Sequence, residues 1–160
     1  MRLRVIAVGR LKDGPERRLY EHYEERLTAA GRSVALAPFS LHEMQESRLA
    51  SAEARKGDEA ARMQAHAGDG AVMIALDERG KAMTSPEFAD WLRAERNGGT
   101  KEIHFLIGGP DGHGSAVLAA ARLRLSLGAM TLPHGLARVV LMEQLYRAET
   151  IIAGHPYHRA

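Results

Sequence analysis

The sequence predicts an α/β fold in which a mostly parallel sheet is flanked by helices, with residues 1–160 forming a single domain. Short apolar segments, typical of buried strands, alternate along the chain with segments of helical periodicity. No internal repeat, low-complexity tract or long linker divides the chain. A hydrophobic content of 45% over 160 residues is enough for one core of ordinary size.

The first half of the chain is expected to supply two strands and two helices. Residues Arg2–Val8 are rich in Leu, Val and Ile and predict the first strand. Pro15 suits the first position of a helix, whose apolar residues recur at helical spacing until Gly31, a natural C-terminal cap. Residues 33–38 predict a short second strand. Residues 41–67 are polar and rich in alanine, and predict a loop followed by a helix that is interrupted or weakened at Gly57.

The second half repeats this alternation. The run AVMIAL at 71–76 is apolar throughout, which is typical of a strand buried on both faces. A helix is expected to begin at the T-S-P of 84–86 and to end at the N-G-G of 97–99. The later predicted elements are a strand over 102–107, a helix over 115–122, a strand over 123–127 and a helix over 136–153, which Gly154 ends.

Composition narrows the classes of protein to consider. No apolar run approaches the roughly 20 residues needed to span a bilayer, and the N-terminal MRLRVIAVGR predicts a strand rather than a signal peptide. The absence of cysteine excludes disulfides and thiolate metal sites, so we expect a cytoplasmic protein with no membrane partner. The net charge of +2, from 22 basic and 20 acidic residues, permits binding to nucleic acid without requiring it.

The loop LIGGPDGHG, residues 106–114, follows a predicted buried strand. Gly109, Gly112 and Gly114 give G-x-x-G-x-G, which is not the G-x-G-x-x-G of a dinucleotide site. Gly109 and Gly114 have the spacing of a phosphate-binding P-loop, but the lysine that such a loop needs is missing, so ATP or GTP hydrolysis is disfavoured. Two interpretations remain open, a tight strand-to-helix turn and a loop that approaches a ligand.

Two further segments share the position of this loop. Residues 77–80 (DERG) follow the strand at 71–76, and residues 128–135 (GAMTLPHG) follow the strand at 123–127. Because ligands bind at the carboxyl ends of strands in open α/β sheets, the three loops are expected to form one pocket. The last loop is mostly apolar, which suits a flat, neutral ring held by backbone groups rather than a polyphosphate.

Several blocks of sequence occur together in one order: V-I-A-V-G-R-L-K-D, I-A-L-D-E-R-G-K, I-G-G-P, T-L-P-H, E-Q-L-Y-R-A and H-P-Y-H-R. With these blocks the chain resembles the ribosomal RNA large-subunit methyltransferase H family of the SPOUT superfamily. The resemblance runs the length of the chain and is weakest over 38–68. It implies a SPOUT-type domain with a C-terminal trefoil knot, which sequence physics alone would not predict.

The resemblance also implies an activity. Such enzymes transfer a methyl group from S-adenosyl-L-methionine to N3 of a pseudouridine in helix 69 of 23S rRNA, on the assembled ribosome, and they work as homodimers. No metal is expected, because His155 and His158 have the spacing of metal ligands but no cysteine or paired acid beside them. By resemblance, the cofactor-binding residues are Leu76, Gly108, Gly128, Ala129, Met130, Thr131, Leu132 and Pro133. These positions fall in the three loops that the strand pattern had already singled out.

The proton on N3 must leave for methyl transfer, so a base or a group that stabilises the anion is useful. The candidates for this catalytic role are His158, Arg159, Tyr157 and Arg138, and beyond these His155, His134 and Glu143. The tail that contains the first three either docks on its own domain through Tyr157 or, as the resemblance favours, enters the pocket of a neighbouring subunit. The residues Arg138, Glu143 and Arg147 are equally suited to ion pairs within the helix or at a dimer interface.

Two general features bear on partners. Hydrophobic residues occur on more than one side of the last helix, which predicts a homodimer independently of the family. With only 8 aromatic residues, recognition of RNA by shape and phosphate is more plausible than base stacking. The candidate basic residues for RNA contact are Arg2, Arg4, Arg10 and Lys12 at the start of the chain, and Arg17, Arg18, Arg122 and Arg124 elsewhere.

Two alternatives to this function remain open. One is a SPOUT methyltransferase that acts on another RNA site, and the other is a non-catalytic nucleotide-binding module.

Overall fold

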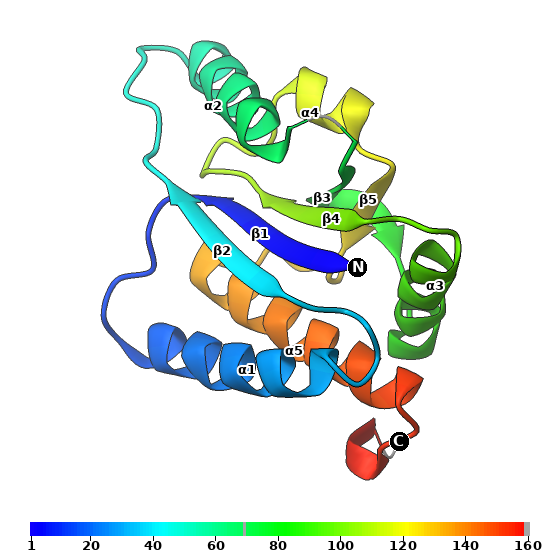
Figure 1. Cartoon of the computed structure of the whole chain (residues 1–160). Coiled ribbons are helices and arrows are strands. Elements are labelled where there is room, and N and C mark those ends of the chain that lie inside the picture. Colours follow the sequence, from blue (N-terminus) through cyan, green and yellow to red (C-terminus); the bar gives the residue numbers. More distant parts are fainter. Residues whose placement is uncertain (69, 159–160) are drawn as a thin grey trace.

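The computed structural model describes residues 1–68 and 70–158, with the backbone but not the side chain of His158. Within this part of the chain, five strands form one parallel sheet in the order β2-β1-β4-β3-β5 (Figure 1). The predicted parallel α/β class is therefore confirmed. The strands are β1 (Arg2–Val8), β2 (Phe39–Met44), β3 (Val72–Ala82), β4 (Glu102–Ile107) and β5 (Leu123–Ser126).

Helices cover both faces of the sheet (Figure 1). One face carries α1 (Pro15–Gly31), α3 (Ser85–Asn97) and α5 (His134–Ile152), and the other carries α2 (Ala52–Ala67) and α4 (Ser115–Ala120). A short 3₁₀ turn, η1 (Pro156–His158), follows α5. None of the helices in residues 1–68 and 70–158 is long and apolar enough to cross a membrane.

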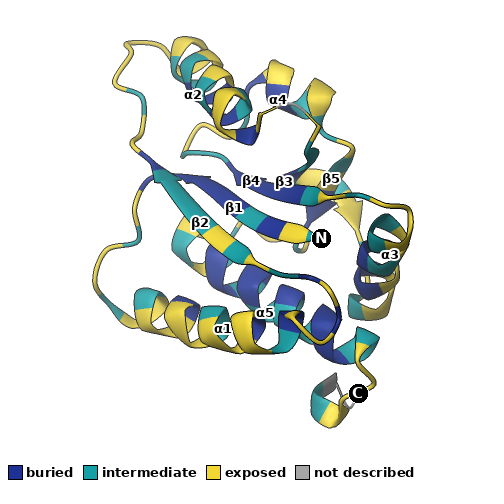
Figure 2. Cartoon of the chain, in the orientation of Figure 1, coloured by how far each residue is buried: buried dark blue, intermediate teal, exposed yellow. Residues whose placement is uncertain are grey.

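The central strands are apolar throughout because both of their faces are covered. Along β1, Val5 and Ala7 belong to the core beneath α1, α3 and α5, whereas Ile6 and Val8 face the smaller core beneath α2 and α4. Successive side chains of a strand point to opposite faces, so a sheet covered on both sides needs apolar residues at every position. Figure 2 shows the resulting buried strands between half-exposed helices.

The predicted strand over 33–38 is wrong, and the second strand lies further on, at Phe39–Met44. Val34 and Leu36 are buried at alternate positions, which resembles a strand in the sequence, but the chain turns there. The amide of Leu36 donates to the carbonyl of Gly31 at 2.8 Å, and Ala35 between them has a φ of 56°. Pairing with β1 begins only after this turn. The real β2 is harder to recognise because it is a half-polar edge strand.

Two other differences concern element lengths. The helix α2 runs through Gly57 without interruption, and Ser51 caps its start, where the side chain accepts from the amide of Ala54 at 3.1 Å. The strand β3 continues to Ala82, beyond the predicted end at residue 76. Both Leu76 and Lys81 pair with Leu125 of β5, so residues 77–80 bulge out of the sheet and the strand then resumes.

Candidate functional site

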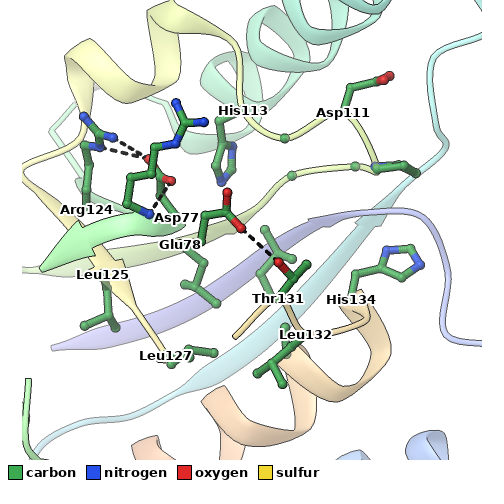
Figure 3. A pocket seen from close by; sticks show the side chains of 18 of the residues that line it. Asp77, Glu78, Asp111, His113, Arg124, Leu125, Leu127, Thr131, Leu132 and His134 are labelled. Carbon is green, nitrogen blue, oxygen red and sulfur yellow. Dashed lines mark hydrogen bonds and ion pairs between the residues drawn. The ribbon is translucent and has the colours of Figure 1, made fainter. Parts of the chain in front are cut away.

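A cavity of about 740 Å³ opens at the carboxyl edge of the sheet (Figure 3). Its walls come from the bulge of β3, from the glycine loop after β4 and from the segment between β5 and α5. Parallel strands end at the same edge of a sheet, so three segments that are far apart in the sequence meet there. The cavity lies within the size range of small-molecule sites.

The structure brings together most of the predicted cofactor-binding residues. Seven of the eight line the cavity: Leu76, Gly108, Gly128, Met130, Thr131, Leu132 and Pro133. Ala129 is in the same segment but is not among the lining residues. Met130 is the most exposed large apolar side chain at this site, with 83% of its surface accessible.

The floor of the cavity is apolar. Leu76, Leu125, Leu127 and Leu132 contribute side chains to it from the strand ends and the following segments. Aliphatic side chains beside exposed backbone groups suit a flat ring that is held by shape and main-chain hydrogen bonds.

The glycine loop is a tight turn, which confirms one of the two interpretations, and it also forms a wall of the cavity, where approach to a ligand stays a prediction. The amide of Gly112 donates to the carbonyl of Gly109 at 2.9 Å. A side chain on Gly108 would place its Cβ 3.0 Å from the carbonyl carbon of Gly112, and Gly112 itself has a φ of 80°. Residues with side chains fit neither position without movement, so the loop keeps its backbone close to the cavity.

The bulge of β3 is fixed by an ion pair with β5. The guanidinium of Arg124 lies 2.6 Å from Oδ2 of Asp77, whose Oδ1 accepts from the amide of Arg79 at 3.0 Å. Burial alone would raise the pKa of Asp77, but the Arg79 amide and the Arg124 guanidinium hold it below its ordinary value. Asp77 is therefore an anion at neutral pH, and its charge is already paired.

One side-chain contact spans two walls of the cavity. The hydroxyl of Thr131 donates to Oε2 of Glu78 at 3.1 Å, which joins the bulge of β3 to the segment before α5 (Figure 3). Both side chains are largely exposed, so a ligand can compete for either partner. The sequence drew attention to residues 77–80 only as a loop, and it gave no signal that Glu78 and Thr131 meet.

A histidine that was not predicted as a site residue also lines the cavity. A ring nitrogen of His113 lies 3.1 Å from the carbonyl oxygen of Leu106. Burial lowers the pKa of His113, so its ring is neutral at neutral pH. The neighbouring Asp111 pairs with Arg55 of α2 at 2.7 Å, which anchors the outer part of the glycine loop. The dense glycines around His113 were the only available sequence signal.

Arg138, predicted as a catalytic residue, does not line the cavity. Its side chain is 1% exposed, and its guanidinium donates at 2.7 Å each to Glu43 and to the carbonyl oxygens of Val8 and Gly9. The amide of Leu11 donates to the same Glu43 carboxylate at 2.8 Å. Arg138 thus fastens α5 to the carboxyl ends of β1 and β2, and in this chain it has no access to a substrate.

The C-terminal tail docks on its own helix, far from the cavity. The hydroxyl of Tyr157 donates to Oε1 of Glu143 at 3.2 Å, and its ring lies 4.7 Å from the ring of Tyr146. Arg147 also pairs with Glu143, at 2.6 Å, so these charges form an ion pair within the helix. The first turn of α5 contributes residues to the cavity wall. The tail leaves the other end of this helix and folds back as far as Glu143, so Tyr157 does not line the cavity.

The tail residues predicted as catalytic differ in what the structure describes. Burial, with Glu143 and Tyr23 close by, raises the pKa of Tyr157, so its phenol keeps its proton at neutral pH and cannot act as a base there. The side chain of His158, and all of Arg159, lie outside the described residues. His134 is an exposed residue at the rim of the cavity.

The basic residues near the N-terminus do not form one surface. Arg2 and Arg4 lie at the amino end of β1 and pair with Glu102 at 2.9 and 3.6 Å. Arg10 and Lys12 follow the carboxyl end of β1 and are exposed on the side of the cavity. The two pairs therefore lie at opposite ends of β1. Three of the other basic candidates pair with carboxylates: Arg17 with Glu21, Arg122 with Glu95, and Arg124 with Asp77.

Comparison with known proteins shows the family to which this chain belongs. The family model described as predicted SPOUT methyltransferase matches residues 1–158. The chain is thus a SPOUT methyltransferase by sequence family. Proteins named ribosomal RNA large subunit methyltransferase H from Brucella anthropi and Sinorhizobium fredii are each 49% identical to it over 160 residues, which is 100% of both chains. The chain belongs to the ribosomal RNA large subunit methyltransferase H family.

A further relative and a solved structure complete the comparison. The protein of the same name from Agrobacterium fabrum is 48% identical over 159 residues, 99% of each chain. The SpoU methyltransferase AviRb from Streptomyces viridochromogenes, solved in complex with AdoMet, matches 90% of this chain with 12% identity and a TM-score of 0.42. This chain spans 56% of the length of that structure.

Proposed function

We propose that this protein uses S-adenosyl-L-methionine to methylate N3 of a pseudouridine in helix 69 of 23S rRNA on the assembled ribosome. Family membership and the full-length relatives named as ribosomal RNA large subunit methyltransferases support this proposal. The single structural observation that carries it is the cavity formed by the bulge of β3, the glycine loop and the segment before α5.

The residues present in the cavity fit this cofactor. The side chains of Leu76 and Leu132, with the close-packed backbone at Gly108, form a slot for an adenine ring. Glu78, whose only described side-chain partner is the hydroxyl of Thr131, can accept hydrogen bonds from ribose hydroxyls instead. The exposed Met130 would cover the bound ligand. When bound, the cofactor supplies an electrophilic methyl group on sulfur; the protein supplies orientation and exclusion of water.

A homodimer would bring the missing part of the site. In this chain the hydroxyl of Tyr157 contacts Glu143 in the middle of α5, whereas the cavity lies at the first turn of that helix, so the tail residues predicted as catalytic, Tyr157, His158 and Arg159, would act on the cavity of a second subunit. We propose that they do so and that Tyr157 orients the base, because its phenol is protonated at neutral pH. Arg138 acts as a positioning residue that holds the first turns of α5 against β1. The C-terminal trefoil knot of the family is part of the same proposal.

Exposed basic residues near the cavity are suited to contact RNA phosphates. Arg10 and Lys12 extend from the carboxyl end of β1 on this side. Their contacts would make binding to ribosomes weaken steeply as salt rises, because each contact releases counterions from the RNA. A flat response between low and physiological ionic strength would contradict these phosphate contacts.

Mass mapping of 23S rRNA from a strain that lacks this protein tests the function. We expect loss of one methyl group on the helix 69 pseudouridine, restored by the wild-type gene. An unchanged helix 69 with a methyl group lost elsewhere would indicate another RNA site. Calorimetry with S-adenosyl-L-methionine on the purified protein tests the cofactor separately, since a module for a different nucleotide would give no heat with it.

A further inference from the structure

Two histidines outside the cavity approach each other through their ring nitrogens. His42 is on the edge strand β2, and His66 is in the last turn of α2. Their Nε2 atoms are 3.1 Å apart, their ring centroids are 3.9 Å apart, and the ring planes differ by 42°. Neither residue lines the cavity, and His66 is exposed to solvent. The pair is therefore a separate feature that the proposed methyl transfer does not use.

The separation of the two nitrogens matches that of two ligands of one metal ion. Imidazole nitrogens bind zinc at about 2.0–2.1 Å, which places two of them about 3.4 Å apart at a tetrahedral angle and about 2.9 Å apart at a right angle. The observed 3.1 Å lies between these values. With the nitrogens this far apart, two imidazoles on one ion would have ring centroids about 4.8 Å apart rather than 3.9 Å, so the rings must rotate away from each other for both lone pairs to meet at the ion.

We propose that His42 and His66 form a two-histidine site for a divalent late transition metal ion, of the class Cu²⁺, Ni²⁺ or Zn²⁺. Imidazole suits these ions, whereas Mg²⁺ and Ca²⁺ prefer oxygen ligands. In residues 1–68 and 70–158, no group of three or more His, Cys, Asp or Glu residues could hold a metal ion. The pair therefore offers two protein ligands, and water completes the coordination.

The surroundings of the pair allow a cation to approach. The nearest strand, β1, places Arg4 opposite Ser40, two residues before His42. The guanidinium of Arg4 donates to the hydroxyl of Ser40 at 3.2 Å and pairs with Glu102 at 3.6 Å, so its charge is partly balanced. A bound ion would join β2 to the end of α2, across 24 residues of chain. We expect it to stabilise the fold without entering the reaction.

The test is a titration of the untagged, full-length protein with copper(II) sulfate in a non-chelating buffer, followed by electron paramagnetic resonance. The wild-type protein should bind one Cu²⁺ with hyperfine coupling from two equatorial nitrogens. Either His42→Asn or His66→Asn should leave one nitrogen and weaken binding by roughly 100-fold, because the second imidazole binds intramolecularly in the wild-type protein. Nickel and zinc should raise the melting temperature of the wild-type protein but not that of His42→Asn or His66→Asn.

The matched control is His22→Asn, which removes an exposed histidine of α1 and should leave the spectrum and affinity unchanged. Melting curves without metal show whether each variant is folded, and His66→Asn is the safer of the two because His66 is exposed. Copper binding that survives both substitutions would place the ion elsewhere and overturn the proposal. Absence of binding to the wild-type protein at millimolar copper would leave only an imidazole hydrogen bond, which also overturns it.

Discussion

The segment that leads into α5 and the buried face of α5 itself are neighbours in sequence but differ in almost every physical respect. Residues 128–133 are mostly exposed, and the hydroxyl of Thr131 makes their main side-chain contact, to Glu78. Within α5, Arg138 and Glu149 are buried to within 1% of their surface. The first region leaves groups open for a ligand, whereas the second buries ionisable side chains, of which Arg138 fixes the helix against the sheet. Function and stability are thus separable along one short stretch of chain.

Replacing Arg138 should give the largest effect, on stability. The substitution Arg138→Ala leaves the carboxylate of Glu43 and the carbonyl oxygens of Val8 and Gly9 without their buried donor. Breaking a buried pair by removing one partner costs about 3–5 kcal/mol. Urea unfolding measures this loss. The control Arg93→Ala removes an exposed pair with Asp90 and should cost about 0.5 kcal/mol or less. Equal losses of stability in both variants would contradict the proposed stabilising role of the buried Arg138 side chain.

The other buried ionisable side chain of α5, Glu149, should make the stability of the protein depend on pH. Burial raises the pKa of Glu149 to about 9 in the folded protein, from an ordinary value of 4.5. The native carboxyl keeps its proton over a range in which the unfolded chain loses it, so this stability is complete below about pH 4.5 and is lost as the pH rises towards 9. The loss is on the order of 1 kcal/mol per pH unit.

The variant Glu149→Gln mimics the protonated side chain and should remove this dependence. We expect its free energy of unfolding to exceed that of the wild-type protein increasingly between pH 5 and pH 8. Chemical unfolding at several pH values compares the two proteins. Parallel curves would show that Glu149 has the same protonation in the folded and unfolded states.

Individual elements of the fold show what the sequence could and could not predict. The position of β4 and the start of α3 follow from local signals, an apolar run and a Thr84 capping box with Glu87. The meeting of three loops at one edge follows from parallel topology alone. By contrast, the partner of Arg138 is 95 residues away in a half-polar edge strand, β2, whose position was itself mispredicted. Pairs of this kind depend on tertiary packing, which periodicity does not encode.

Between these extremes, the bulge of β3 can be tested with a matched pair of glycines. In Gly80→Ala the new Cβ would lie 2.6 Å from the backbone carbonyl of Arg124, so the bulge or β5 must shift, at a cost of about 1–3 kcal/mol. In Gly57→Ala nothing lies within 4 Å, and the residue is inside α2, so we expect a gain of about 0.5–1 kcal/mol. Thermal melts distinguish opposite signs. A neutral Gly80→Ala would mean that the cavity wall adapts easily.

The smallest effect on stability should come from replacing Met130, in the exposed segment before α5. Its side chain is 83% exposed, so Met130→Ala should change the free energy of unfolding by less than about 0.5 kcal/mol. If Met130 covers the cofactor as proposed, the variant should bind S-adenosyl-L-methionine about tenfold more weakly, because that apolar surface is no longer buried on binding. Calorimetry measures both proteins beside Leu49→Ala, an exposed apolar control that does not line the cavity. Unchanged affinity in Met130→Ala would show that this side chain does not cover the bound S-adenosyl-L-methionine.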